Sequence, residues 1–317
     1  MSLLTKVTLP NGALFNASQT FLGADSLFTT GTVLFVNSVT GSNDNAGTDP
    51  GSPKATVQGA ISAATATKGD KIVVMPGHAE TVTATSINLS KAGVTVVCLG
   101  SGLARPIFTY STAAATITVS AANCAFIGGD HFANFLDVAS AFTIGAAKDF
   151  QLVGNTFRNS SASLNFLSVV TTGSTANAAD GLLVDGNFYH NLNTSPLAFI
   201  SVLGTIARLT VTNNDVVSAS TADVGHFITF SSLNSTGTRI VGNSLVVVGV
   251  TTAAVGIFLT GSGTAHTGIV RDNFVSSLDT TTELVFTAGT GLVYFRNEYT
   301  GVADKSGYIL PAIDSAA

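Results

Sequence analysis

The chain has 317 residues, of which only 10% are charged and 45% are hydrophobic. Ordinary soluble domains carry roughly 25% charged residues, so we expect part of the surface to be covered by other subunits. The net charge of −5 provides no basic face, which argues against a nucleic-acid partner. Uninterrupted apolar runs stay well short of the ~18 residues of a membrane span, so a membrane partner is not expected either.

The first 31 residues are predicted to form an arm that docks on a partner. Their opening, MSLLTKVTLPNG, lacks the apolar core of a signal peptide, so export by that route is not expected. The segment has too few apolar residues to fold alone, and these residues gain burial only on another protein. The predicted partner-binding residues are Leu3, Leu4, Leu9, Leu14, Phe15, Phe21, Leu22 and Phe28.

Residues 32–95 are predicted to form a cap region with an amphipathic helix over about 53–67 and a first coil. In SPKATVQGAISAATATKGD, Ser52 can cap the helix, Pro53 suits its first turn and Gly69 can end it. An apolar stripe spaced i, i+3, i+4, i+7 would lie over the first coil. Its members are Val57, Ala60, Ile61 and Ala64.

A strand-like run ends abruptly in GDKIVVMPGHAETV (Gly69–Val82). Pro76 and Gly77 break the run, and His78 and Glu80 follow closely. A His near a Glu can perform acid–base chemistry, whereas Pro-Gly marks a turn. We interpret this segment as a structural corner.

Residues 96–300 contain a repeated phrase of apolar residues, then Gly or Asp, then Asn, then often an aromatic residue. It appears as LVGNTF (Leu152–Phe157), LVDGNF (Leu183–Phe188), RIVGNSL (Arg239–Leu245) and IVRDNF (Ile269–Phe274), and its apolar anchors recur at steps of 25 to 31 residues. Between copies lie segments such as AFISVL and HFITFS, which alternate like half-buried strands. A unit this short cannot bury its own apolar face, so the units are expected to stack into a parallel solenoid.

Equivalent residues of successive coils lie in register in such a stack. We predict one interior column formed by Val153, Val184, Val211, Val241 and Val270. The recurring Asn residues are expected at a corner, where their amides hydrogen-bond from coil to coil and where Asn tolerates a left-handed backbone. Residues 301–317 follow the coils as a C-terminal tail.

The stretch from Leu34 to Val82 resembles the opening of pectate-lyase-like right-handed β-helix proteins. In that family an extended strand, a Gly/Asn/Asp loop, an SP-x-x-T-I-Q-x-A-I helix and a GD-x-I-x-V-x-PG-x-Y-x-E strand precede the coils, and His78 stands here at the usual Tyr position. With the repeats, the resemblance covers about residues 32–300. It implies an all-β fold, a right-handed parallel β-helix with an N-terminal capping α-helix. The family includes lyases, hydrolases, epimerases and phage tailspike and virion proteins, so fold alone does not imply function.

The catalytic motifs of the family are present only as fragments. The galacturonase motifs NTD, DD, GHG and R-I-K do not occur in the sequence. The resemblance to pectate lyases would imply a DH near Ca²⁺-binding acids and an R-x-P-x-x-R, and the chain offers Asp130-His131 and Arg105-Pro106 without the second Arg. If the protein is an enzyme, the candidate catalytic residues are Asp130, His131, Asp185 and Asp215, the last two being possible neighbours one coil apart. Surface-turn acids are the competing interpretation.

Neither a metal nor a cofactor is predicted. The His residues at 78, 131, 190, 226 and 266 lack a metal-ligand spacing such as H-x-H or HExxH. Cys98 and Cys124 are predicted to be buried free thiols, with a disulfide or metal site as the alternative.

Two classes of function remain. The first is a non-enzymatic phage virion protein, tailspike-like, that decorates or stabilises the capsid as a homotrimer, with the major capsid protein or another virion protein as partner. Its expected location is the virion, after synthesis in the host cytoplasm. The second is a tailspike that binds or degrades host surface polysaccharide, although the absence of Trp and the five Tyr weigh against aromatic sugar platforms. A bacterial surface adhesin is a third, weaker candidate because a signal peptide is missing.

Overall fold

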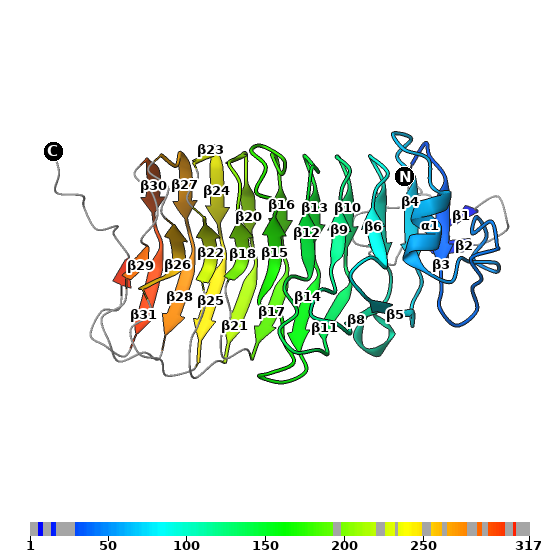
Figure 1. Cartoon of the computed structure of the whole chain (residues 1–317), viewed down its shortest axis with the longest axis horizontal. Coiled ribbons are helices and arrows are strands. Elements are labelled where there is room, and N and C mark those ends of the chain that lie inside the picture. Colours follow the sequence, from blue (N-terminus) through cyan, green and yellow to red (C-terminus); the bar gives the residue numbers. More distant parts are fainter. Residues whose placement is uncertain are drawn as a thin grey trace.

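The computed structural model is a right-handed parallel β-helix, as the sequence predicts. It describes residues 6–8, 14–16, 29–192, 198–219, 226–231, 234–248, 255–261, 265–277, 284–286, 291–301 and 307–308. Each complete coil contributes one strand to each of three sheets, here named sheets I, II and III in chain order (Figure 1). Three corners, I–II, II–III and III–I, join the sheets.

The strands of each sheet stack in chain order along the axis. Sheet I comprises β3 (Val33–Val36), β4 (Lys71–Val74), β7 (Thr95–Cys98), β10 (Ala125–Ile127), β13 (Gln151–Val153), β16 (Leu183–Asp185), β20 (Thr210–Thr212), β24 (Thr238–Val241), β27 (Gly268–Arg271) and β30 (Leu292–Phe295). Sheet II comprises β5 (Ala79–Val82), β8 (Ile107–Tyr110), β11 (Asp130–Ala133), β14 (Thr156–Asn159), β17 (Phe188–Asn191), β21 (Asp215–Ser218), β25 (Ser244–Val247), β28 (Phe274–Ser277), β31 (Glu298–Gly301) and β32 (Gly307–Tyr308), the last antiparallel to β31.

Sheet III comprises β6 (Ile87–Leu89), β9 (Ile117–Val119), β12 (Phe142–Ile144), β15 (Ser168–Thr172), β18 (Ala198–Val202), β22 (His226–Phe230), β26 (Val255–Gly261) and β29 (Leu284–Phe286). Outside the three sheets lie the hairpin β1 (Lys6–Thr8) and β2 (Leu14–Asn16), the pair β19 (Ile206–Ala207) and β23 (Ser235–Thr236), the helix α1 (Val57–Ala63) and the 3-10 helix η2 (Gly102–Ala104).

The interior is filled by apolar side chains that repeat at the same place in successive coils. On sheet I the inward column is fully buried and consists of Val96, Phe126, Leu152, Val184, Val211, Ile240 and Val270. Val184, Val211 and Val270 therefore occupy the predicted column. Val153 and Val241 do not, because Leu152 pairs with Val184 and Ile240 pairs with Val211. The prediction was wrong by one residue there, and a one-residue slip moves a strand side chain to the outer face.

A ladder of buried asparagines runs along the I–II corner, as predicted. Its members are Asn155, Asn187, Asn214, Asn243, Asn273 and Asn297, all at most 1% exposed. At each step the side-chain amide of one Asn donates to the side-chain oxygen of the next at 2.9–3.2 Å. The left-handed backbone conformation predicted for these asparagines is instead found at the residue before each of them, for example Gly154 (φ 63°) and Asn213 (φ 54°). The side chain of each ladder asparagine therefore points into the interior.

The helix α1 exists but is shorter than the predicted 53–67. Thr56, not Ser52, is its N-cap, and the Thr56 hydroxyl accepts a hydrogen bond from the Gly59 N–H at 3.0 Å. The side-chain oxygen of Asn43 accepts from the backbone N–H groups of Ala55 and Thr56 at 3.2 Å and holds this segment outside the helix. The helix ends at Ala63 because the next residue is extended (φ −68°, ψ 151°).

The predicted arm over residues 1–31 falls mostly outside the described residues. The backbone of β1 and β2 forms an antiparallel hairpin, and the side chains predicted to bind a partner lie outside the described part. Residues 29–32 are already attached to the β-helix. Thr29 Oγ1 donates to the Gly69 carbonyl, and Thr32 N donates to Asp70 Oδ1 at 2.7 Å.

The two cysteines are buried free thiols, as predicted. Burial raises the pKa of the Cys98 and Cys124 thiols, which makes both poor nucleophiles. In the part of the chain that the structure describes, no helix is long and apolar enough to cross a membrane.

Candidate functional site

Asp130 and His131 are neighbours in β11, but their side chains lie on opposite faces of sheet II. Asp130 faces outward, and its two carboxylate oxygens accept from Arg158 Nε at 3.1 Å each and from Arg158 Nη2 at 3.0 Å. The Arg158 guanidinium lies 4.2 Å above the centre of the Phe132 ring. The Asp130 carboxylate is thus held in a bidentate ion pair with a residue one coil away.

His131 faces inward and is 0% exposed. Its ring stacks between Phe108 and Phe157, with centroid distances of 5.3 and 4.8 Å. Its Nδ1 lies 3.1 Å from the Tyr110 hydroxyl, and its Nε2 lies 3.4 Å from Asn155 Oδ1. Burial lowers the pKa of His131 to about 3 and outweighs the hydrogen bond to Asn155 Oδ1, which raises the pKa. The imidazole is neutral at neutral pH and begins the asparagine ladder inside the core.

Asp185 and Asp215 are brought to different sheets. Asp185 is on the outer face of sheet I, where it accepts from Thr212 Oγ1 at 2.6 Å and from Asn213 Nδ2 at 2.9 Å. Asp215 is exposed at the start of β21 on sheet II, in register with Phe188. The I–II corner lies between the two residues, so the structure does not bring the two carboxylates together on one sheet.

Arg105, in the ARPIF fragment, holds the I–II corner across two coils. Its Nη2 donates to the Gly154 carbonyl at 3.2 Å, and its Nη1 donates to Thr156 Oγ1. The corner residue of the intervening coil is Gly128, which has a left-handed backbone (φ 82°). The guanidinium therefore acts as a clamp between corners.

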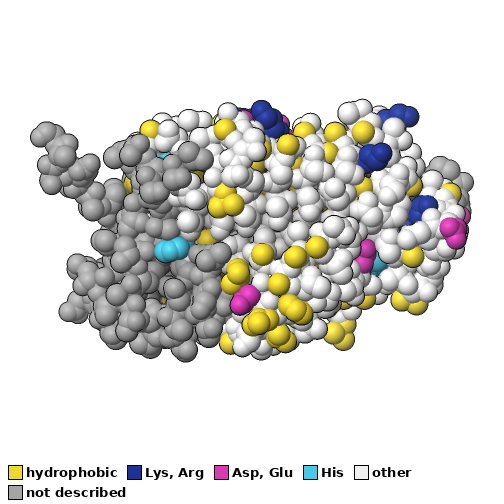
Figure 2. Space-filling model, viewed as in Figure 1, with side chains coloured by type: hydrophobic (Ala, Val, Ile, Leu, Met, Phe, Trp, Pro, Cys, Tyr) yellow, Lys and Arg dark blue, Asp and Glu magenta, His cyan; other side chains and the backbone are white. Residues whose placement is uncertain are grey.

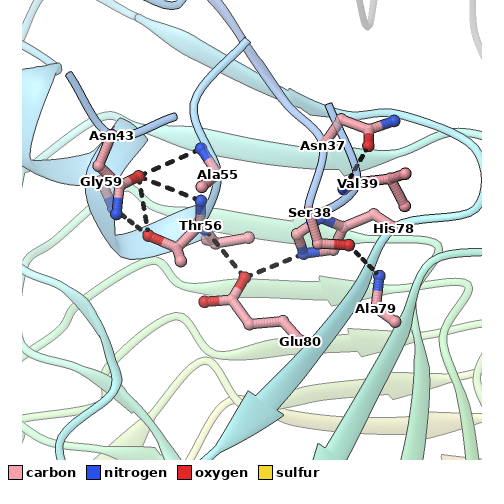
Figure 3. Close-up of polar contacts among 11 residues, drawn as sticks. Asn37, Ser38, Val39, Asn43, Ala55, Thr56, Gly59, His78, Ala79 and Glu80 are labelled. Atoms are coloured by element: carbon pink, nitrogen blue, oxygen red, sulfur yellow. Dashed lines mark hydrogen bonds and ion pairs between the residues drawn. The ribbon is translucent and has the colours of Figure 1, made fainter. Parts of the chain in front are cut away.

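The PGHAE segment forms the first I–II corner and also anchors the helical cap (Figure 3). Gly77 supplies the left-handed turn (φ 79°). His78 is fully buried, and its Nε2 lies 3.0 Å from Glu80 Oε2. The same carboxylate oxygen accepts from the backbone N–H of Val57 at 2.9 Å, at the N-terminus of α1. A carboxylate is favourable at this end of a helix, so both residues join the corner to the cap.

An open hollow of about 340 Å³ lies at the I–II corner towards the C-terminal end of the β-helix. Its lining residues are Asp272, Asn273, Phe274, Arg296 and Glu298. Asp272 accepts from Arg296 Nε at 2.8 Å and from Arg296 Nη2 at 3.1 Å. Phe274 is 37% exposed and pairs in register with Glu298. The hollow thus combines two carboxylates, a guanidinium and an aromatic face.

The sequence patterns did not single out Arg158, Arg296 or Glu298 as candidate site residues. Arg158 and Arg296 each pair with an Asp one coil away, 28 and 24 residues earlier in the chain. This spacing is close to the repeat length, so an opposite charge one repeat away was the available signal. Among the described residues no group of three or more His, Cys, Asp or Glu side chains could hold a metal ion.

Comparisons with known proteins support the fold. No protein-family model and no curated protein matches the chain. Among solved structures, a GH136 lacto-N-biosidase from Eubacterium ramulus is similar over 84% of this chain and 56% of its own length, with 9% identity and a TM-score of 0.51. A rhamnogalacturonan lyase is similar over 88% of this chain and 90% of its own, with 13% identity and a TM-score of 0.41. At 9% identity, the likeness to the lacto-N-biosidase concerns the β-helix and not the activity.

Proposed function

We propose that the chain is a non-enzymatic structural protein of a phage virion, tailspike-like, that decorates or stabilises the capsid as a homotrimer. The observation that carries the proposal is the structural use of its candidate catalytic groups. Asp130 holds Arg158, His131 begins the asparagine ladder, and Asp185 binds the next coil. Groups engaged in this way connect neighbouring coils of the β-helix.

Two observations support the proposal that this is a virion protein: the family resemblance and the amino-acid composition. A chain with only 13 Lys and Arg and 18 Asp and Glu residues has few charges to keep its outer faces in water. Contact with other copies and with a capsid protein removes such faces from water. The N-terminal segment carries the proposed contact with the major capsid protein or another virion protein.

The test compares attachment and turnover in one preparation. Purified protein is mixed with particles that lack it, and occupancy is measured by cryo-electron microscopy. The same protein is incubated with polysaccharides of the host surface, and new chain ends are measured. We expect attached trimers and no new chain ends, with Asp130→Asn, Asp185→Asn and Asp215→Asn attaching like the wild type. Polysaccharide turnover that one of these substitutions abolishes would overturn the proposal.

A second candidate function is a tailspike that binds or degrades host polysaccharide. The hollow at the I–II corner favours it, because Asp272, Glu298 and the exposed ring of Phe274 surround one space. Two carboxylates and an aromatic face are groups that sugar sites use. Under this alternative, Glu298→Gln and Phe274→Ala would weaken the binding of a host polysaccharide, whereas Asp215→Asn on the same sheet would leave it unchanged.

A further inference from the structure

The outer face of sheet III carries one row of hydroxyl and amide side chains. Four half-buried members, Asn88, Thr118, Thr143 and Thr171, pair in register from β6 to β15. The register continues into Ser201, which is buried and lies 3.0 Å from the Ser168 hydroxyl, and into Thr229, whose hydroxyl is also buried. Neighbouring polar side chains already bond along this face. Ser120 Oγ donates to Asn88 Oδ1 at 2.8 Å, and the hydroxyls of Thr116 and Thr143 lie 2.9 Å apart.

These strands carry no Asp, Glu, Lys or Arg. Between Ile87 and Phe230, the six strands β6, β9, β12, β15, β18 and β22 contain His226 as their single titratable residue. In Figure 2 the middle band of the coloured surface is correspondingly white, and the charged side chains gather at its margins. The surface of a soluble protein normally carries interspersed charges of both signs, so a face this long without charge is unusual for a solvated sheet.

The other two sheets differ from sheet III in charge. The outer face of sheet I carries Lys71, Asp185, Arg239 and Arg271. The outer face of sheet II carries Asp130, Arg158, Asp215 and Glu298. When copies pack in parallel about a symmetry axis, equivalent residues meet at the same height. Charges of one sign would then repel their own copies, whereas a hydroxyl both donates and accepts and so complements itself.

The II–III corner beside this row carries exposed apolar side chains. Phe135 is 40% exposed and Leu136 is 55% exposed, on a loop that forms a β-bridge from Leu136 to Leu164 of the next coil. The Phe135 carbonyl accepts from Asn165 N at 3.1 Å, which ties the two loops together. Hydrophobic side chains gather in Figure 2 over the lower ends of β11 and β14, where these loops lie. Asp137 is the exposed charge on this loop.

We infer that the outer face of sheet III, together with the apolar tips of the II–III corner, is the surface by which copies of this chain pack against one another. The occupant is a second copy, and the inference rests on the proposed homotrimer. The half-buried hydroxyls of Thr118 and Thr171 supply self-complementary hydrogen bonds, and Phe135 and Leu136 supply apolar contact beside them. Rigid apolar anchors next to a polar face are typical of protein interfaces.

Lysine substitutions of matched threonines test the assignment. Thr171 on sheet III, Thr210 on sheet I and Thr109 on sheet II are all half-buried and outward-facing. Thr171→Lys places like charges at one height in the interface and should weaken association at least about tenfold. Thr210→Lys and Thr109→Lys should leave the trimer unchanged. The molar mass is measured by light scattering after size exclusion, and circular dichroism reports the fold.

Each outcome decides between the interface and the trimer. A folded Thr171→Lys protein that remains trimeric overturns the interface, as does a trimer that only Thr210→Lys or Thr109→Lys dissociates. The proposed homotrimer survives in both cases. A wild-type chain that is monomeric at micromolar concentration overturns the homotrimer and the interface together. Should Thr171→Lys fail to fold, Thr118→Lys on the same row is the second variant, with the same expected dissociation.

Discussion

Asn243 is an interior rung of the corner ladder and uses its whole side chain. Its Nδ2 donates to the Val211 carbonyl at 2.9 Å and to Asn273 Oδ1 at 3.0 Å. Its Oδ1 accepts from the backbone N–H and the side-chain amide of Asn214 at 3.0 and 2.9 Å. These groups are buried, so each one that loses its partner has no water to replace it.

Asn243→Ala should therefore lower the free energy of unfolding by about 2–4 kcal/mol. Asn213→Gly is the matched control, because Asn213 is exposed, left-handed and makes one side-chain bond to Asp185. Glycine accepts that backbone conformation, so the control should change stability by less than about 1 kcal/mol. Denaturant titrations of both variants provide the measurement. Equal losses for the two would refute the ladder as a source of stability.

His131 should make the stability of the protein depend on pH. Its pKa falls from 6.5 to about 3 on folding because the ring is buried. Between these values the unfolded chain binds a proton that the folded chain does not. The contribution is therefore fully present above pH 6.5 and declines as the pH falls towards 3, by up to about 1.4 kcal/mol per pH unit.

The variant His131→Phe keeps an aromatic ring between Phe108 and Phe157 and removes the titration. Its unfolding free energy should fall less steeply than that of the wild type as the pH is lowered from 6.5 to 3. Comparing the two slopes cancels the carboxylates, which titrate in both proteins. Identical slopes would mean that His131 is accessible to protons in the folded state.

At the scale of elements, the cap helix depends on two side chains that meet its first turn. Thr56 accepts from Gly59 N, and Glu80 accepts from Val57 N. α1 has only seven residues, so its N-terminal bonds are a large share of its polar contacts. Its buried residues, Val57, Ala60 and Ile61, supply the rest of its stability by covering the interior.

Thr56→Ala should lower the stability of the cap by about 1 kcal/mol, and Thr56→Ser should restore most of it because the hydroxyl is kept. Hydrogen exchange of the amides of Val57, Gly59 and Ile61 is the suitable measurement, since a solenoid can open from one end. Faster exchange that is confined to the cap supports the assignment. Uniform acceleration along all coils would instead show that the cap and the coils unfold as one unit.

The repeated Asn phrase predicts the elements better than their register. Each ladder Asn follows a left-handed residue, and the inward residue of sheet I lies three positions before it, as Leu152 does before Asn155. In LVGNTF both Leu152 and Val153 are apolar, so hydrophobicity alone cannot select the inward one. Pairing with the next coil decides, and it is a long-range property. The ladder asparagine is therefore a better reference than the apolar residues for aligning successive coils.

The contacts of the candidate site likewise depend on the register between coils, which the local sequence does not reveal. Asp130 and Arg158 are 28 residues apart, and the step between coils varies along the chain. Their ion pair could not be predicted before the register was known. The adjacent pair Asp130-His131 attracted attention because it resembles a motif, yet alternation along β11 sends the two side chains to opposite faces. His131 is therefore a core residue, although the sequence around it resembles a catalytic motif.

At the scale of the whole molecule, the three faces of the β-helix are chemically unequal. Sheets I and II and the corner between them carry the outward charges, several of them in ion pairs between coils, such as Asp130 with Arg158 and Asp272 with Arg296. Sheet III carries the hydroxyl row. Exposed ion pairs add little stability. The unequal distribution of charge therefore affects what each face can contact more than it affects the stability of the coils.

The N-terminal segment should attach the β-helix to the particle without contributing to the contact between copies. Thr29 and Thr32 are bonded to Gly69 and Asp70 of the first coil, so a deletion has to stop at residue 28 to leave the cap intact. The Leu and Phe residues that we predict to bind a partner gain about 25 cal/mol for each Å² that they bury there. Deletion of residues 1–28 should abolish attachment, while light scattering still finds a trimer.

A full-length variant with Phe15→Ser, Phe21→Ser and Phe28→Ser separates the apolar contact from mere length. It should lose most of its attachment, because the segment keeps its reach but not its buried area. Particle occupancy is measured by cryo-electron microscopy for the wild type, the deletion and the triple variant at equal concentration. Occupancy of the deletion at the wild-type level would place the anchor on the coils, and the II–III corner would be the next surface to test.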